Sequence, residues 1–454
     1  MKKKPLSPCF GLLLAAAMTC IARADMILDW NDVASDVFLA NTTIQNPGMA
    51  SRSLAMVNIA MYDAINGIDP THQQLFSYTA PASGASASAA AAQAAYHVLS
   101  SVYPDQQSTL DARLASTLRS IPNGQAKSDG VAYGEMVGSS IVTMRSSDGF
   151  NNVVPYTSQS SAGHWEADPL NPDQQAWGPE WGQIDTFCIP EPNMVGPTPA
   201  LNSQEYTDAF NEVKLLGAKN STARTADQTE AGIFWAYDRL GMGTPMRIYS
   251  GIMQTVAADQ GNDLHENARM FAMASAAIAD AGITAWDSKF AYDFWRPVSG
   301  IRRADEDGNP DTAQDATWEP LGAPGGIAPD GSTIDDFTPP FPTYLSGHAS
   351  FGGAMFQALT NFYGTDDIRF EAMSDELPGV VRSFDSFSEA NEENGRSRVY
   401  LGIHWNFDDT EARFMGAETA DYIFANYFQP VPEPASGWLL GIGLLWICRC
   451  VKRA

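Results

Sequence analysis

Three short motifs carry side chains suited to binding an oxyanion, and the first joins two cations. Lys289 is followed after six residues by Arg296 and Pro297. On one continuous helix, residues seven apart lie two turns apart on the same face, so both cations would reach a single anion. Pro297 would then end that helix. Taken alone, such a pair is more often a solvated surface pair than a binding site.

The second motif runs from Pro342 to His348 and leads into an apolar segment. At a helix start, Ser346, Gly347 and His348 would offer a hydroxyl group, backbone N–H groups and an imidazole to one ligand. The positive end of the helix dipole would add to them. The alternative is an ordinary serine N-cap followed by an incidental histidine.

The third motif extends from Ser397 to Asp408. The guanidinium of Arg398 is suited to clamping an oxyanion through two N–H groups. His404 follows after five residues as a ligand or a nucleophile. Asp408, four residues further on, would accept the other imidazole N–H and fix the tautomer.

The segments that must position these motifs show helical spacing of apolar residues, whereas regular alternation is scarce. Five helices are predicted, at about 46–68, 86–103, 262–295, 346–363 and 409–427. Residues 150–205 are rich in Trp, Pro and Gly without periodicity, and they carry Trp165, Trp177 and Trp181. This segment is predicted to be a long ordered loop. The fold class is therefore all-α, as helical bundles with long irregular loops.

Composition narrows the class of protein. The 454 residues include 44% hydrophobic and 18% charged side chains, which excludes a wholly disordered chain. A formal charge of −26 argues against nucleic acid or an anionic lipid surface as the main partner. Mean hydropathy of −0.20 excludes a polytopic membrane protein. Outside the two terminal hydrophobic segments Cys188 is the single cysteine, so an internal disulfide or a cysteine-based zinc site is not expected there.

Both ends of the chain look like targeting segments. Three lysines, an apolar run over 9–21 and an Ala-x-Ala site predict a signal peptide at 1–24; the alternative is a buried N-terminal helix. The segment 431–454 contains Pro-Glu-Pro, about a dozen apolar residues and a basic end, and it resembles the PEP-CTERM sorting signal. The alternative is a plain C-terminal anchor. The resemblance implies processing by signal peptidase and an exosortase, a transient membrane tether, and export to the periplasm, outer surface or extracellular matrix of a Gram-negative bacterium.

Together and in this order, the three motifs resemble the signature of the vanadium haloperoxidase and type 2 phosphatidic acid phosphatase superfamily. Trp286 and Phe341 resemble aromatic halide-pocket positions of the chloroperoxidase branch. Leu28-Asp29-Trp30 and the Ala55–Ile68 segment resemble bacterial secreted members, so the resemblance covers nearly all of 25–428. It divides the chain into an N-terminal helical region at 25–205, which includes the Trp- and Pro-rich loop, and a catalytic helical region at 206–428.

The resemblance implies a vanadate-dependent enzyme that oxidises halide with hydrogen peroxide to hypohalous acid, which then reacts with a small organic acceptor. Two alternatives stay open: an exported acid phosphatase that forms a phosphohistidine and needs no cofactor, and a non-catalytic surface protein of the matrix that binds oxyanions. His72, His97, His164 and His265 are expected to be structural or exposed. The implied catalytic residues are Lys289, His348, His404 and Asp408. The implied vanadate-binding residues are Lys289, Arg296, Ser346, Gly347, Arg398 and His404, with His404 as the vanadium ligand.

Overall fold

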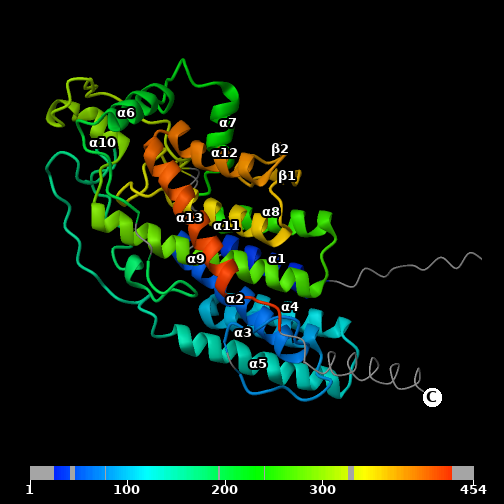
Figure 1. Cartoon of the computed structure of the whole chain (residues 1–454). Helices are drawn as coiled ribbons and strands as arrows, with labels where there is room; N and C mark the ends of the chain where they lie inside the picture. Colours follow the sequence, from blue (N-terminus) through cyan, green and yellow to red (C-terminus); the bar gives the residue numbers. More distant parts are fainter. Residues whose placement is uncertain are drawn as a thin grey trace, which may run out of the picture.

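The computed structural model describes residues 25–40, 46–76, 78–192, 195–239, 241–325 and 332–431. Within these ranges the chain forms thirteen α-helices, joined by long loops, and one two-stranded hairpin (Figure 1). The prediction of an all-α fold is confirmed. The α-helices are α1 Met26–Ala40, α2 Pro47–Ile68, α3 Ala87–Val102, α4 Gln107–Ser120, α5 Gln125–Arg145, α6 Gln204–Leu216, α7 Ala226–Phe234, α8 Pro245–Gln260, α9 Leu264–Tyr292, α10 Pro297–Arg302, α11 Gly347–Tyr363, α12 Phe387–Tyr400 and α13 Asn406–Asn426.

The signal peptide predicted at 1–24 lies outside the described residues, as does all but the first residue of the sorting segment predicted at 431–454. Among the helices that the structure describes, none has the length and apolar character needed to cross a membrane. The domain boundary expected at 205–206 falls in the first turn of α6. The division into two regions stays a prediction.

Helix α9 lies at the centre of the molecule and carries Lys289 near its end. In Figure 1 it runs between the blue and cyan helices α2–α5 and the yellow and orange helices α11–α13. It packs against α2 on one side and against α11 and α13 on the other. Asp263 caps its first turn by accepting the N–H groups of His265 and Glu266, each at 2.9 Å. Because both sides of α9 are covered, apolar residues surround it instead of forming a single stripe.

The alanine-rich helix α3 packs unusually close to α5. A Cβ atom at Gly134 of α5 would lie 2.2 Å from the carbonyl oxygen of Ala90, so any larger residue there would force the two helices apart. Small residues on both helices let the backbones approach each other. Together with α2, this pair forms the lower layer on which α9 rests.

Described residues between 150 and 203 contain no α-helix, only a single turn of 3₁₀-helix at Trp181–Gln183, in agreement with the long loop predicted there. Trp165 and Trp181 are buried against the helices. Asp280 of α9 fastens one turn of this loop by accepting the backbone N–H groups of Phe187, Cys188 and Ile189 at 2.6, 2.8 and 3.0 Å. The loop is thus held to the central helix by a buried carboxyl group.

This carboxyl group should make the stability of the fold depend on pH. Burial raises the pKa of Asp280 to about 6, although the three N–H donors oppose the shift. Because the folded-state pKa lies above the unfolded value, the free energy of unfolding should fall as pH rises from about 4 to about 7. The expected contribution is about 3 kcal/mol. In Asp280→Asn this pH-dependent part of the free energy of unfolding should disappear. In Asp105→Asn, which alters an exposed carboxyl group, it should persist. Urea unfolding at several pH values would measure it, and identical pH profiles for wild type and Asp280→Asn would contradict the expectation.

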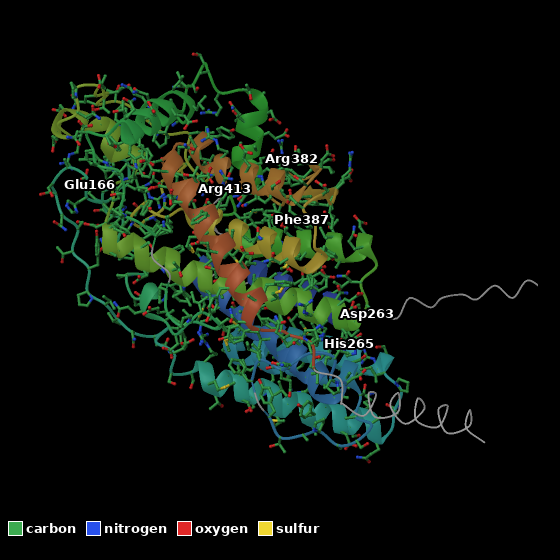
Figure 2. The ribbon with its side chains drawn as sticks, in the orientation of Figure 1. Glu166, Asp263, His265, Arg382, Phe387 and Arg413 are labelled. Carbon is green, nitrogen blue, oxygen red and sulfur yellow. The ribbon has the colours of Figure 1, made fainter. Side chains whose placement is uncertain are left out.

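The hairpin formed by β1 (Phe370–Met373) and β2 (Val381–Phe384) was not predicted from the sequence. Its strands pair antiparallel with Phe370 opposite Phe384, and each has only four residues, too few for an alternating pattern to stand out. Arg382 of β2 makes ion pairs with Asp227 and Glu230 of α7 and with Glu393 of α12 (Figure 2). The hairpin therefore braces α7 and α12, and α12 carries the first residues of the third motif.

Candidate active site

The structure brings the three motifs together from five places in the chain. Lys289 comes from the last turn of α9, Arg296 from the residue before α10, and the Ser-Gly-His run from the start of α11. Arg398 lies at the end of α12, and His404 lies in the short connection to α13. All of these side chains are at least nine-tenths buried.

One local expectation is wrong. Lys289 and Arg296 do not share a helix, because α9 ends at Tyr292 and Asp293 adopts a left-handed conformation with φ of 52°. Asp293 accepts hydrogen bonds from Tyr156 and His164, which hold the chain at this turn. Pro297 accordingly starts α10, where its missing N–H costs nothing, instead of ending α9.

Lys289 is enclosed by backbone oxygens. Its ammonium group donates to the carbonyl groups of Pro342 at 3.1 Å and Thr343 at 2.9 Å, and also to that of Leu345. These bonds use all three of its protons. Burial, together with the nearby Arg296, holds the pKa of Lys289 well below its usual range. Lys289 therefore fastens the 342–345 segment in this structure, and one of these bonds must be exchanged for it to reach an anion.

The two arginines, in contrast, leave donors free in the interior. Arg296 donates through Nε to the carbonyl oxygen of Phe341 at 2.9 Å and through Nη1 to that of Ile403 at 2.8 Å, while Nη2 has no partner among the described residues. Arg398 likewise has Nε and Nη1 buried without a partner in the described ranges. A buried N–H without an acceptor costs about 1–3 kcal/mol. These orphan donors indicate an anion acceptor between the two guanidinium groups.

Arg398 is oriented by an acidic residue that sequence reasoning did not find. Its Nη2 donates to the carboxylate of Asp238, which lies in the connection between α7 and α8. This ion pair occupies Nη2 and leaves Nε and Nη1 of the guanidinium without a partner among the described residues. The Asp238–Arg398 contact joins residues 160 positions apart.

His404 is held by a buried acceptor, as predicted. Its Nδ1 lies 2.8 Å from Asp408 Oδ2, and Arg296 Nη1 lies 3.0 Å from Nε2. Since arginine can only donate, Nε2 must carry the lone pair and Nδ1 the proton, so the tautomer follows from the partners. Burial and the three surrounding cations keep the pKa of His404 well below its usual range. The lone pair on Nε2 is what a metal ligand or a nucleophile requires, and Arg296 must give up its bond to Nε2 before the nitrogen can act as either.

Thr343, which was not singled out from the sequence, completes this arrangement. Its hydroxyl group donates to Asp408 Oδ2 and lies 3.1 Å from His404 Nδ1. The backbone N–H of Trp405 donates to the same carboxylate oxygen at 3.0 Å. Burial raises the pKa of Asp408 above its usual range, against the effect of these donors.

Removing the Thr343 hydroxyl group should loosen the histidine without unfolding the protein. In Thr343→Val the carboxylate loses one of its three donors, so His404 is oriented less firmly. We expect the affinity for orthovanadate to fall about tenfold, the lower end of the effect of a lost outer-shell partner. Thr419→Val removes a buried hydroxyl group from α13 away from the site and should leave affinity unchanged. Calorimetric titration of both variants would measure this, and equal affinities would contradict a positioning role.

His348 has a different environment from His404. Its Nε2 lies 2.8 Å from the carbonyl oxygen of Ala236, so Nε2 carries the proton and Nδ1 the lone pair. Burial and the charge of Arg398 lower the pKa of His348 to about 3. The backbone oxygen of the same residue accepts bonds from Tyr249 at 3.1 Å and Asn394 at 2.9 Å. His348 is therefore a fixed, neutral imidazole with a free base at Nδ1.

Ser346 is the N-cap of α11, and its hydroxyl group accepts the N–H of Ala349 at 3.4 Å. The two interpretations of Ser346, as a helix cap and as a binding residue, therefore do not exclude each other. The backbone N–H of Ser346 donates to the carbonyl oxygen of Asp408 at 3.0 Å, which ties the second motif to the third. Gly347 begins the helix, and a Cβ atom there would lie 3.2 Å from the ring of Trp286. The first turn of α11 thus faces the same region as the cations.

The comparison with known proteins agrees with this geometry. The family model described as the VCPO second helical-bundle domain matches residues 269–432. The vanadium chloroperoxidase of Curvularia inaequalis is 31% identical over 495 residues, which cover 86% of this chain and 80% of that protein. The chain belongs to the vanadium haloperoxidase family.

Two solved structures share the fold of this haloperoxidase. The structure described as the first bacterial vanadium-dependent iodoperoxidase has a TM-score of 0.74 at 23% identity and covers 90% of this chain and 98% of its own. A holo-type bacterial vanadium-dependent chloroperoxidase has a TM-score of 0.63 at 16% identity, with 84% and 92% covered. Both similarities concern the fold.

The aromatic pair that resembles a halide pocket is brought together beside the cations of this haloperoxidase. The rings of Trp286 and Phe341 have centroids 5.1 Å apart, and Lys289 Nζ lies 5.5 and 5.0 Å from them. Sequence reasoning missed Trp177, whose ring contacts both at 5.3 and 6.2 Å. Its place in a loop without periodicity gave no signal of this contact. The halide role of the pair stays a prediction.

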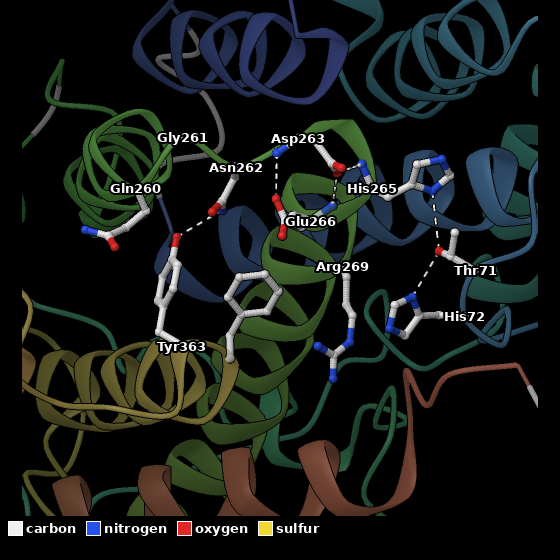
Figure 3. A pocket seen from close by; sticks show the side chains of 11 residues that line it. Thr71, His72, Gln260, Gly261, Asn262, Asp263, His265, Glu266, Arg269 and Tyr363 are labelled. Carbon is white, nitrogen blue, oxygen red and sulfur yellow. Dashed lines mark hydrogen bonds between the residues drawn. The ribbon is translucent and has the colours of Figure 1, made fainter.

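Of the other four histidines, only His164 lies near the site, where it contacts Asp293. His97 pairs with Glu135 on the surface, whereas His164 contacts Asp293 at 2.9 Å and so supports the turn between Lys289 and Arg296. His72 and His265 line a cavity of about 600 Å³ at the start of α9, where the hydroxyl group of Thr71 lies between them (Figure 3). That cavity is about 36 Å along α9 from Lys289, at 1.5 Å per residue, so it is not part of the oxyanion site.

Proposed function

We propose that this chain is a vanadate-dependent haloperoxidase that uses hydrogen peroxide to oxidise halide to hypohalous acid. The observation that carries the proposal is the set of unpartnered N–H donors on Arg296 and Arg398 beside the lone pair of His404. Membership of the vanadium haloperoxidase family supports it.

The residues fit vanadate as an anion better than they fit a bare metal ion. The described parts of the chain contain no group of three or more His, Cys, Asp or Glu side chains that would hold a metal. Instead they offer three cations and one imidazole lone pair, which match an oxyanion bound by charge with a single nitrogen ligand. Arg296, Arg398 and Lys289 would hold the oxygens, with Ser346, and His404 Nε2 would hold the vanadium.

Bound vanadate would supply the Lewis acid that activates hydrogen peroxide towards halide. The chain's own residues prepare the reaction. His348 Nδ1, which is unprotonated here, would accept a proton from the incoming peroxide and later return it to a leaving oxygen. Negative charge bound beside Arg398 would oppose the effects of burial and of Arg398 and raise the pKa of His348 for this task. Asp408 and Thr343 hold the tautomer of His404. The buried guanidinium groups stabilise negative charge in a region from which water is excluded.

A direct assay tests the proposed function. The full chain, loaded with orthovanadate, should brominate a dimedone dye in the presence of bromide and hydrogen peroxide. Protein treated with a vanadium chelator should lose this activity and regain it on adding vanadate. Absence of bromination and of iodide oxidation at all pH values between 4 and 8 would overturn the proposal.

A phosphatase is the second candidate, because the lone pair of His404 would also suit attack on phosphorus. Phosphate is a tetrahedral oxyanion like vanadate, so the same cations would bind it. Hydrolysis of an aryl phosphate by the vanadium-free chain, inhibited by added vanadate, would favour this function. If neither activity is found while vanadate still binds, a non-catalytic oxyanion-binding protein is indicated.

We also propose that the chain is exported and processed at both ends. The support is the sequence of residues 1–24 and 431–454, which resemble a signal peptide and a sorting signal. The mature protein should start at Asp25 and lack the apolar segment after Pro434. The intact mass of protein recovered from the cell surface measures this. A mass that includes Lys452 and Arg453 would favour a permanent anchor.

A further inference from the structure

Another cavity, of about 330 Å³, lies against the last two turns of α9. Residues of the 154–156 and 179–183 segments form one wall, and the last two turns of α9, from Trp286 to Ala291, form the other. We propose that this cavity binds an electron-rich aromatic molecule carrying an O–H or N–H group, the acceptor that the enzyme halogenates. The proposal rests on the haloperoxidase function above and names the class of its organic substrate.

The walls of the cavity suit a flat apolar ring. Tyr156 and Phe290 meet edge to face with centroids 5.1 Å apart, and proline and alanine side chains fill much of the remaining wall. Aromatic rings favour such edge-to-face and offset contacts with another ring. The volume lies at the lower end of the range typical of small-molecule sites, enough for one or two fused rings.

Two polar side chains in this wall, the partly buried Asp287 and the exposed Gln183, have no protein partner within the described ranges. No hydrogen bond or ion pair joins the side chain of Asp287 or Gln183 to another described residue, although Asp287 is partly buried. A carboxylate can only accept hydrogen bonds, so it selects a ligand that donates one. Burial raises the pKa of Asp287, which reflects the poor hydration of this wall. The cavity therefore favours a phenol, an indole or a similar molecule over a plain hydrocarbon.

The position of Trp286 links the cavity to the chemistry. Trp286 is one of the residues that line the cavity, and its buried ring contacts Phe341 and lies 5.5 Å from Lys289 Nζ. A single indole ring thus separates the acceptor from the cations that would hold vanadate. Gly182 keeps the loop close, since a Cβ atom there would lie 2.3 Å from the Cα atom of Asp287.

The reaction in the cavity balances without another reagent. A ring carbon of the acceptor gives an electron pair to the halogen of hypohalous acid, so a carbon–halogen bond forms and the oxygen–halogen bond breaks. The hydroxide that leaves takes the ring proton and becomes water. A hydrogen bond from the acceptor's O–H to Asp287 increases electron density on the ring and fixes its orientation. Halogenation should therefore favour one ring position over the others.

Filling the cavity tests the proposal with the full chain. Ala291 lines the cavity and is exposed on α9, so Ala291→Trp should occupy the space without disturbing the core. Ala115→Trp, at an exposed position of α4, is the matched control. Equilibrium dialysis of 2-naphthol should show binding to wild type and Ala115→Trp, and at least about tenfold weaker binding to Ala291→Trp. Equal binding of 2-naphthol to wild type and Ala291→Trp would overturn the proposal.

A second measurement distinguishes binding of the organic acceptor from oxidation of the halide. Oxidation of iodide to triiodide needs no organic acceptor, so Ala291→Trp should retain it. Its bromination of phenol should instead shift from one preferred ring position to the mixture of ortho and para products that free hypobromous acid gives. Replacement of the O–H by a methyl ether should weaken binding about tenfold in wild type but little in Asp287→Leu. If Ala291→Trp keeps the ring preference of wild type, the proposal fails. If no form oxidises iodide, the haloperoxidase function fails, and the dialysis result still decides whether the cavity binds the ring.

Discussion

His404→Ala should bind orthovanadate more than about 100-fold more weakly than wild type. Loss of an outer-shell partner costs 10- to 100-fold in metal affinity, and this variant removes the nitrogen ligand itself. It also frees Arg296 Nη1, which now donates to that nitrogen at 3.0 Å, so the remaining cations can still attract the anion weakly. Halide oxidation should fall with the bound fraction and recover only partly at high vanadate concentration.

Calorimetric titration of vanadate into the vanadium-free protein would measure this loss directly. His97→Ala, which alters a histidine paired with Glu135 on the surface, is the control and should titrate like wild type. Near-normal affinity in His404→Ala would show that the metal is not held by this imidazole. The unprotonated Nε2 of His404 would then have a role other than binding vanadium.

His348→Ala should fail in the opposite way, with vanadate bound and turnover lost. The Nε2–H of His348 is spent on the carbonyl oxygen of Ala236, so the residue gives the oxyanion no N–H donor from that nitrogen. Its free Nδ1 is a general base, and losing a general acid–base typically costs roughly 10²–10⁴ in rate. We therefore expect kcat to fall by that factor while vanadate affinity stays close to wild type.

The two histidine variants must be compared in the same pair of experiments, titration and steady-state halide oxidation. Equal loss of vanadate binding in both would show that the roles assigned to the two imidazoles are wrong. Unchanged kcat in His348→Ala would remove it from the proton transfer. Addition of free imidazole should restore part of the rate in His348→Ala, provided that the vacated space admits it.

The sequence predicted the parts of this site that depend on nearby residues. The start of α11 could be predicted because Ser346 caps it and apolar residues follow at helical spacing. The start of α9 could be predicted from the region around Asp263, which makes a reciprocal cap with Glu266. The pairing of His404 with Asp408 follows from a four-residue separation at the beginning of α13. Such signals require only a few consecutive residues.

The parts that depend on distant contacts could not be predicted. The turn between Lys289 and Arg296 exists because Asp293 is held by Tyr156 and His164, more than 125 positions earlier in the chain. A seven-residue spacing alone cannot distinguish that turn from a continuous helix. The partner of Arg398 was one of 53 acidic residues, and only folding selects Asp238. The four-residue strands of the hairpin are likewise formed through their pairing and not through their own pattern.

The enclosure of Lys289 by backbone carbonyl groups has a consequence for how the protein acquires its cofactor. A buried ammonium group without partners would destabilise the vanadium-free chain, but here all three of its protons are bound within the 342–345 segment. The charge of Lys289 is thus satisfied by the fold without an anion. We therefore expect the vanadium-free chain to fold and to gain activity when vanadate is added. Supply of the trace element, not supply of new protein, would then control how much activity there is.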